Sequence, residues 1–258
     1  MKSIYRNKYL IFIFTISLLT NLSSQNKKDN IWADDNFTGL QFRSIGPALM
    51  SGRISDIAVH PEDDNIWYLT VGSGGVWKTS NAGVTWTPIF DDQGSYSIGC
   101  VTIDPNNPHI VWIGTGEDLG GRHFGYGDGV YRSDDGGKTW KNMGLKNSEH
   151  VSKILIHPEN SNIVWVASQG PLWSKGGDRG VYKSTDGGKN WTNVWSDNEW
   201  TGATELVMDP RNPDRLYLAS WQKHRNIAAY MGGGPGSGIH RSDDGGKSWQ
   251  KLSSGLPQ

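Results

Sequence analysis

One eight-residue pattern occurs four times in this chain and limits its possible folds more than any other feature. The pattern reads Ser-x-Asp-x-Gly-x-x-Trp in three copies and Thr-x-Asn-x-Gly-x-x-Trp in the first. The copies occupy residues 79–86, 133–140, 184–191 and 242–249, so that their tryptophans are 54, 51 and 58 residues apart. A repeat of about 50 residues is typical of solenoids and propellers.

Short apolar runs in each repeat predict strands. A first run ends at a His-Pro or Asp-Pro pair, a second follows a polar turn, and a third leads into the repeated pattern. The first runs are 54–59, 101–103, 154–156 and 206–208, the second are 66–71, 110–114, 163–167 and 216–219, and the third are 76–78, 130–132, 181–183 and 239–241. With a fourth strand that opens on the tryptophan, each repeat has the four antiparallel strands of a propeller blade. We therefore predict an all-β fold, a β-propeller of about four four-stranded antiparallel blades that form an incomplete ring.

The repeated pattern has the composition of a tight turn with a structural role. The carboxylates of Asp135, Asp186 and Asp244 can accept hydrogen bonds from backbone N–H groups two or three residues ahead, and the glycine supplies a positive φ. The rings of Trp140, Trp191 and Trp249 can then fold back and become buried between blades. Calcium binding at these aspartates is the alternative, but one carboxylate beside glycines offers few of the oxygen ligands that calcium needs. We expect no metal and no cofactor.

The composition excludes several classes of protein. The chain has 258 residues, a formal net charge of −1 and a mean hydropathy of −0.55. This charge argues against an electrostatic nucleic-acid binder, so we expect no nucleic-acid partner. The hydropathy argues against a protein with several membrane spans. The one cysteine, Cys100, excludes an intramolecular disulfide, and its place in an apolar run favours a core position.

The first residues have the order of a secretory signal peptide. Lys2, Arg6 and Lys8 precede an apolar run of about 11 residues, and small polar residues follow it. We predict a signal peptide at 1–24, a loose arm at 25–38 and the propeller blades at 39–258, and hence an exported protein. The alternative is an uncleaved membrane anchor, for which the apolar run is short.

Most candidate ligand-binding residues lie in the loops between the second and third strands of the last three repeats, on the face opposite the repeated turns. Arg53, at the entry to the first strand of the first repeat, is expected to face the same side. Aromatic rings can stack on apolar ligand faces while charged groups fix orientation, which suits a peptide, protein or glycan. Loop packing and solvated charges are the alternative. The candidates are Arg53, Glu117, Arg122, His123, Trp173, Trp221, His224 and Arg225.

The four patterns resemble the Asp box, the bacterial neuraminidase repeat found in sialidases, xyloglucanases and sortilin-type propellers. The stretches 42–47 and 52–54 look like the start of large secreted bacterial proteins with a sortilin N-terminal-like domain, which are often labelled glycosyl hydrolases. Propellers of these families have six, seven or ten blades. The resemblance therefore implies partners for the open blades, either the rest of a longer protein or a self-associated copy.

A glycoside hydrolase is the alternative function that the resemblance implies. Gly72 falls where xyloglucanases place a catalytic Asp, and hydrolysis by the usual route needs two carboxylates. Glu117 and Asp118 offer acids in a different arrangement, but nothing in the sequence pairs them with another carboxylate. Arg43 lies in a stretch that resembles a sialidase motif only loosely, since Ser44 interrupts it. We assign no catalytic residue.

Overall fold

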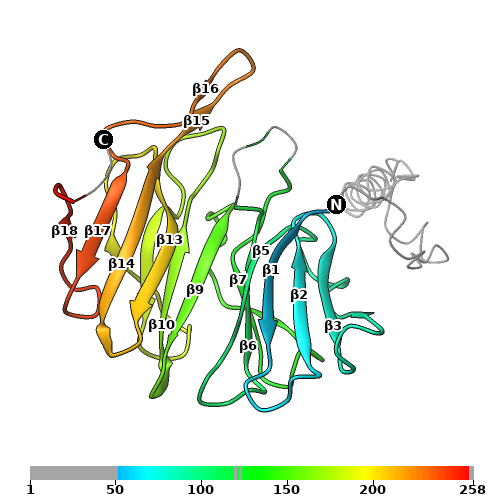
Figure 1. Cartoon of the computed structure of the whole chain (residues 1–258). Coiled ribbons are helices and arrows are strands. Elements are labelled where there is room, and N and C mark those ends of the chain that lie inside the picture. The colour runs from blue at the N-terminus through cyan, green and yellow to red at the C-terminus, as the bar shows by residue number, and fades with distance from the viewer. Residues whose placement is uncertain (1–51, 119–120, 122–123, 256–258) are drawn as a thin grey trace, which may run out of the picture. The chain divides into compact units, whose positions relative to one another are not determined.

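The computed structural model describes residues 52–118, 121 and 124–255 (Figure 1). The predicted signal peptide at 1–24, the arm at 25–38 and the candidates Arg122 and His123 lie outside the described residues. No helix in the described part is long and apolar enough to cross a membrane.

The described residues form four sheets, each with four antiparallel strands in chain order. The first contains β1 (Ile54–Val59), β2 (Trp67–Val71), β3 (Gly75–Thr79) and β4 (Thr87–Pro88), and the second contains β5 (Ile98–Ile103), β6 (Val111–Thr115), β7 (Val130–Ser133) and β8 (Lys141–Asn142). The third contains β9 (Val151–His157), β10 (Asn160–Ser168), β11 (Gly180–Ser184) and β12 (Thr192–Trp195). The fourth contains β13 (Thr201–Asp209), β14 (Asn212–Gln222), β17 (Gly238–Ser242) and β18 (Gln250–Lys251). These are the four predicted blades, and the all-β propeller fold is confirmed.

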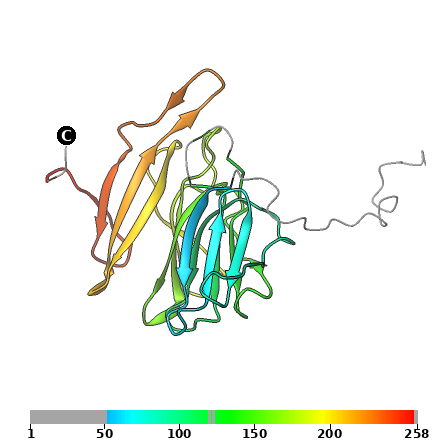
Figure 2. The ribbon, with the colours of Figure 1, turned by 45° about the vertical axis from the view of Figure 1, so that its right-hand side comes forward.

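A small hairpin, β15 (His224–Arg225) with β16 (Tyr230–Met231), interrupts the fourth blade between β14 and β17. In both ribbon views it extends beyond the ends of the sheets, on the side where β1 begins (Figures 1 and 2). The sequence analysis did not predict these two strands.

The first strands of successive blades are neighbours, as expected around a propeller axis. β5 and β9 approach so closely that a Cβ on Gly99 would collide with the backbone carbonyl of Val151. Glycine at this position therefore permits the contact between the inner strands of the second and third blades.

The cores lie between adjacent blades and not within one sheet. Each of three clusters combines second-strand residues of one blade with residues of the next, for example Tyr68 with Val111, and Trp112 with Val164. Trp165 and Leu216 form part of the third. Cys100 is 1% exposed and lies in the cluster of the second and third blades. Burial raises the pKa of its thiol, as expected for a core cysteine.

The repeated turn is held by hydrogen bonds from its Asp or Asn. Asp135 Oδ1 accepts from the backbone N–H groups of Lys138 and Thr139, both at 2.9 Å, and from Ser133 Oγ at 2.7 Å. The donors lie three and four residues ahead, so the predicted spacing of three is confirmed, while a donor four residues ahead takes the place of the one predicted two ahead. The Thr139 hydroxyl also donates to the carboxylate, and these bonds hold the pKa of Asp135 well below its usual range. In the first blade, Asn81 Oδ1 accepts from the N–H of Thr85 at 2.9 Å, so the amide preserves the turn.

The tryptophans of the turns make two kinds of contact. Trp140 Nε1 donates to the carbonyl of Ile89 at 2.7 Å, and Trp191 Nε1 donates to that of Met143 at 2.8 Å. Both acceptors belong to the preceding blade, so these rings tie neighbouring blades together. Trp249 Nε1 instead donates to Gly246, within its own turn, at 3.1 Å.

Replacing Gly188 with alanine is expected to lower the free energy of unfolding by about 2–4 kcal/mol. Its φ of +88° is costly for an L-residue, and a Cβ there would collide with the Trp112 ring of the preceding blade. Gly176 is the matched control, because its φ is +75° but a Cβ would meet nothing within 4 Å. Urea denaturation of both variants separates the backbone strain from the collision, and equal losses would contradict this explanation.

Candidate functional site

Polar groups gather where strands end on the face opposite the repeated turns, which we call the loop face. Arg53 directly precedes β1, and His150 directly precedes β9. Glu117 follows β6 by two residues, Gln169 directly follows β10, and Lys223 directly follows β14. Because inner strands begin on this face and second strands end on it, residues distant in sequence are brought to one place.

Arg53 and Glu117 form an ion pair that joins the first two blades. Both Nε and Nη2 of Arg53 donate to the Glu117 carboxylate, the latter over 2.6 Å. Glu117 is 1% exposed, whereas 45% of the Arg53 side chain is exposed. A Cβ on Gly72 would lie 2.6 Å from the Glu117 carboxyl carbon. Glycine at position 72 therefore leaves the space that the Glu117 carboxylate occupies.

A buried lysine lies near Asp118, the residue after Glu117. Lys223 has no exposed surface, and its ammonium donates to Gln169 Oε1. Gln169 Nε2 donates to the carbonyl of Asp118 at 2.6 Å, which links the second, third and fourth blades. Burial, assisted by the charge of Arg179 and opposed by that of Asp118, lowers the pKa of Lys223 to about 7.

Burial acts on two further groups of this cluster. It raises the pKa of the Asp118 carboxyl, although the positive charge of Lys223 opposes the shift. It lowers the pKa of His150 to about 4, so that this imidazole is neutral at pH 7. The backbone carbonyl of Glu117 opposes this shift.

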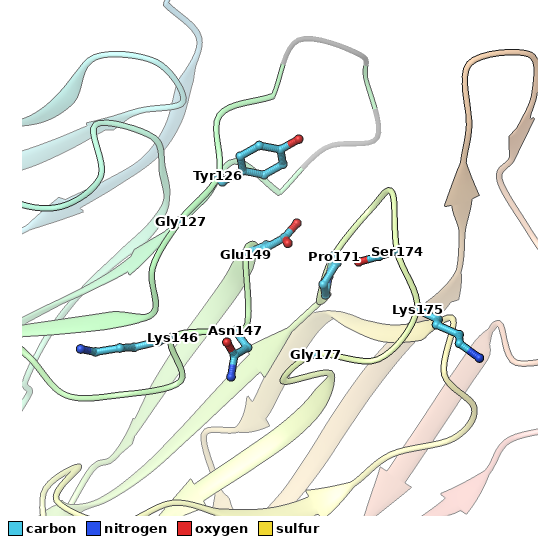
Figure 3. A pocket seen from close by; sticks show the side chains of 9 residues that line it. All are labelled: Tyr126, Gly127, Lys146, Asn147, Glu149, Pro171, Ser174, Lys175 and Gly177. Atoms are coloured by element: carbon cyan, nitrogen blue, oxygen red, sulfur yellow. The ribbon is translucent and has the colours of Figure 1, made fainter.

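An open pocket of about 640 Å³ adjoins the cluster between the second and third blades (Figure 3). Three of its side chains come from the connection before β9 and three from the loop after β10, respectively Lys146, Asn147 and Glu149, and Pro171, Ser174 and Lys175. The lining residues are Tyr126, Gly127, Lys146, Asn147, Glu149, Pro171, Ser174, Lys175 and Gly177. The ring centroids of Tyr126 and His150 lie 6.2 Å apart. Tyr126, which lines the pocket, therefore packs against the buried cluster.

Glu149 is the acidic group of this pocket. It has a φ of +54°, a conformation that is uncommon for residues other than glycine. Its carbonyl accepts from the N–H of Gly127 at 2.7 Å, which joins the connection before β9 to the loop of the second blade. Burial raises the pKa of its carboxyl, and the charge of Arg179 opposes this shift. Strained residues of this kind often occur in binding sites.

The candidates of the fourth blade form a separate aromatic group. Trp221 lies on β14 and pairs with Gly202, so its expected position in a loop was wrong. Its ring centroid is 6.4 Å from that of Tyr230, over which the Arg225 guanidinium lies at 4.2 Å. The His224 ring packs on Trp200 at 4.0 Å.

The predicted candidates therefore divide into two groups and a single residue. Arg53 joins Glu117, while Trp221, His224 and Arg225 cluster around the hairpin. Trp173 lies in the loop after β10 and is 37% exposed. Four residues of the cluster and pocket were not predicted as candidates: Glu149, His150, Gln169 and Lys223. Their position as polar residues at or near the end of an apolar strand was the signal that the sequence offered.

The described residues contain no group of three His, Cys, Asp or Glu side chains placed to hold a metal ion.

Comparison with known proteins identifies similar propellers. A probable oligoxyloglucan-reducing end-specific xyloglucanase of Neosartorya fischeri is 23% identical over 232 residues, with 82% of this chain and 25% of the relative covered. An oligoxyloglucan-reducing end-specific xyloglucanase of Emericella nidulans is 32% identical over 235 residues, with 76% and 27% covered. The chain thus spans about a quarter of the length of these relatives.

Solved structures show the same fold. The crystal structure of an ancestral GH74 enzyme superposes with a TM-score of 0.61 at 21% identity, over 80% of this chain and 24% of that one. A family model described as sortilin, neurotensin receptor 3, matches residues 128–257, which is half of the chain. The chain therefore belongs to the Sortilin-Vps10 family of β-propellers.

Proposed function

We propose that this protein is an exported propeller module that binds a glycan through its loop face. The pocket between the second and third blades carries this proposal, because it places an aromatic ring beside carboxylate, amide, hydroxyl and ammonium groups. A sugar ring can stack on Tyr126 while its hydroxyls bind Glu149, Asn147 and Ser174. The similarity to xyloglucanases supports a polysaccharide over other ligands.

The candidates predicted from the sequence extend this proposed surface. Arg53 with Glu117 borders the buried cluster, and Trp173 follows Pro171 in the loop of the third blade. Trp221, His224 and Arg225 lie at the base of the projecting hairpin. We propose that a glycan chain longer than the pocket reaches these residues, as polymer-binding sites commonly have several aromatic platforms.

Binding of xyloglucan oligosaccharides, measured by calorimetry, tests the proposal. We expect Tyr126→Ala and Glu149→Gln each to weaken the affinity at least about tenfold, corresponding to about 1.4 kcal/mol. Lys189→Ala is the control, since Lys189 is exposed in a repeated turn on the opposite face. Undiminished binding by both pocket variants would contradict this site, and binding of peptides in place of glycans would contradict the ligand class.

Glycoside hydrolysis is the second candidate function, because burial gives Asp118 the raised pKa that a general acid needs. The usual mechanism also needs a second carboxylate, and Glu117 is held by Arg53. If the chain hydrolyses xyloglucan, Asp118→Asn is expected to lower the rate of reducing-end release by about 100-fold or more. Binding of xyloglucan without release of reducing ends would favour a glycan-binding module over a glycoside hydrolase.

The proposed export rests on the predicted signal peptide. Expression in a bacterial host followed by N-terminal sequencing of the exported protein is expected to give a start near Gln25. Recovery of the protein only in the cytoplasm with an intact Met1 would contradict it.

A further inference from the structure

The loop after β10 folds around one buried arginine side chain. Arg179, which directly precedes β11, is 5% exposed. Its Nη1 donates to the carbonyl of Gln169 at 2.7 Å, and its Nε donates to that of Gly176 at 2.8 Å. Its Nη2 donates to the carbonyls of Pro171 and Ser174, the latter at 2.8 Å. One guanidinium therefore fixes the backbone of this loop at four points.

This set of bonds depends on the shape of the guanidinium group. A planar fork of N–H donors can meet carbonyls from several directions at once, whereas a lysine ammonium carries its three donors on one atom. Burial lowers the pKa of Arg179 to about 10, and the charge of Glu149 opposes this shift, so the group is still charged at pH 7. Bonds from a charged donor are stronger than those between neutral groups, which favours a single conformation of the loop.

The backbone of the loop leaves room for this side chain. Gly170 has a φ of +69°, and a Cβ there would collide with Cγ of Arg179. Gly176 has a similar φ of +75°, but a Cβ there would meet nothing within 4 Å. Glycine at position 170 is therefore required both by the backbone conformation and by the path of the arginine side chain.

The loop held by Arg179 is one wall of the pocket. Pro171 and Ser174, two of the four residues whose carbonyls bind the guanidinium, line the pocket (Figure 3). The same loop also contributes Lys175 and Gly177 to the lining. Because Arg179 is buried and bonded to the loop backbone, its effect on a ligand passes through the residues that it holds.

The loop also joins the pocket to segments of the fourth blade. Leu172 is 1% exposed, and its carbonyl accepts from the N–H of Arg225, on the hairpin, at 3.1 Å. Near the other end of the loop, the N–H of Gly176 donates to the carbonyl of Glu199, in the connection before β13, at 2.9 Å. Disorder of the loop would therefore release the hairpin and this connection as well as the pocket wall.

We propose that Arg179 is the positioning residue of the glycan pocket, because it holds the loop after β10 as a preformed wall to which the hairpin is bonded. This role rests on the proposed function for the identity of the ligand alone. A preformed wall spares a ligand the entropic cost of ordering the loop. Loss of the guanidinium should therefore weaken binding although every group that contacts the ligand is still present.

Three variants of the full chain test this role. Arg179→Lys keeps the charge but loses the fork, and Gly170→Ala keeps the arginine but displaces its side chain. We expect each to weaken the binding of xyloglucan oligosaccharides about tenfold or more and to speed amide exchange at Arg225 by a similar factor, with exchange in β9 unchanged. Gly176→Ala is the matched variant, since it strains the same loop without the collision, and its effects should be at least about threefold smaller.

Chemical rescue separates positioning from a general loss of stability. Arg179→Ala leaves a cavity bordered by four carbonyls, into which guanidinium ion can bind at concentrations far below the denaturing range. Guanidinium chloride should restore most of the affinity and of the protection at Arg225, whereas sodium chloride at the same concentration should not.

Several outcomes would overturn the role of Arg179. These are wild-type affinity and exchange in Arg179→Lys, equal losses in the two glycine variants, and absence of rescue in a folded Arg179→Ala variant. If the wild-type chain does not bind xyloglucan oligosaccharides, the proposed function fails. The exchange and rescue measurements at Arg225 still decide whether Arg179 holds the loop, because they need no ligand.

Discussion

Replacing Trp165 with alanine is expected to lower the free energy of unfolding by about 3–5 kcal/mol, the usual cost of removing a buried tryptophan. The ring is 1% exposed and lies in the core between the third and fourth blades. The variant also loses the bond from Trp165 Nε1 to Gly245 and the surface on which Lys183 lies. The cavity and the lost contacts with the fourth blade therefore both contribute to the destabilisation.

Urea denaturation followed by circular dichroism measures this loss, with Trp173→Ala as the matched control. Trp173 is the same residue type, but it is 37% exposed in a loop, so its removal should cost less than about 1 kcal/mol. Hydrogen exchange should show the largest loss of protection in the fourth blade. Equal destabilisation by the two variants would contradict the placement of the core between blades.

Replacing Lys223 with methionine is expected to stabilise the protein near pH 7 by about 1–2 kcal/mol. A buried charge is often less favourable than an apolar side chain of similar size, although the lost donor to Gln169 Oε1 reduces the gain. Asp118, Arg179 and His150 are the titratable groups that act on this lysine or lie in its cluster.

The stabilisation gained by Lys223→Met should decrease as the pH rises above 7. The pKa of Lys223 is about 7 in the folded chain and 10.5 in its ordinary state, so between these values the unfolded chain binds more protons. The stability contributed at this site therefore rises with pH from about 7 to 10.5 in the wild type. The advantage of Lys223→Met should shrink over the same interval.

Chemical denaturation at pH 7 and at pH 9.5 measures this change, and Lys175→Met is the control at a lysine that is 67% exposed. The interval avoids the titration of His150, whose lowered pKa costs stability as the pH falls from 6.5 to about 4. An advantage of the same size at both pH values would show that Lys223 does not titrate in this range.

The strands of the propeller could be predicted closely because their signals are local. The run 54–59 coincides with β1, since an apolar run bounded by a proline turn has few other stable conformations. Longer strands were underestimated: β14 extends to Gln222, where pairing with β13 continues through residues of mixed polarity. That extension moved Trp221 from a predicted loop into a strand. The hairpin β15–β16 was missed because it has only two residues on each strand.

The loop face was predictable only in part. Glu117 and Arg53 were found because they border loops that the blade topology places together. Lys223 and His150 were not predicted. Their burial and altered pKa values arise where three blades pack together, and no local sequence pattern indicates which residues of different blades come into contact.

The sequence by itself determined the repeat, the four-stranded blades and the turns, because each depends on residues within about 50 positions of one another. Only the tertiary structure decided which groups share a site and which faces remain open. The carboxylate of Glu117 lies against Gly72 and the ammonium of Lys223 reaches Gln169 through contacts between blades. Such contacts depend on the angle and spacing at which whole sheets pack, and those follow from the combined shape of many side chains.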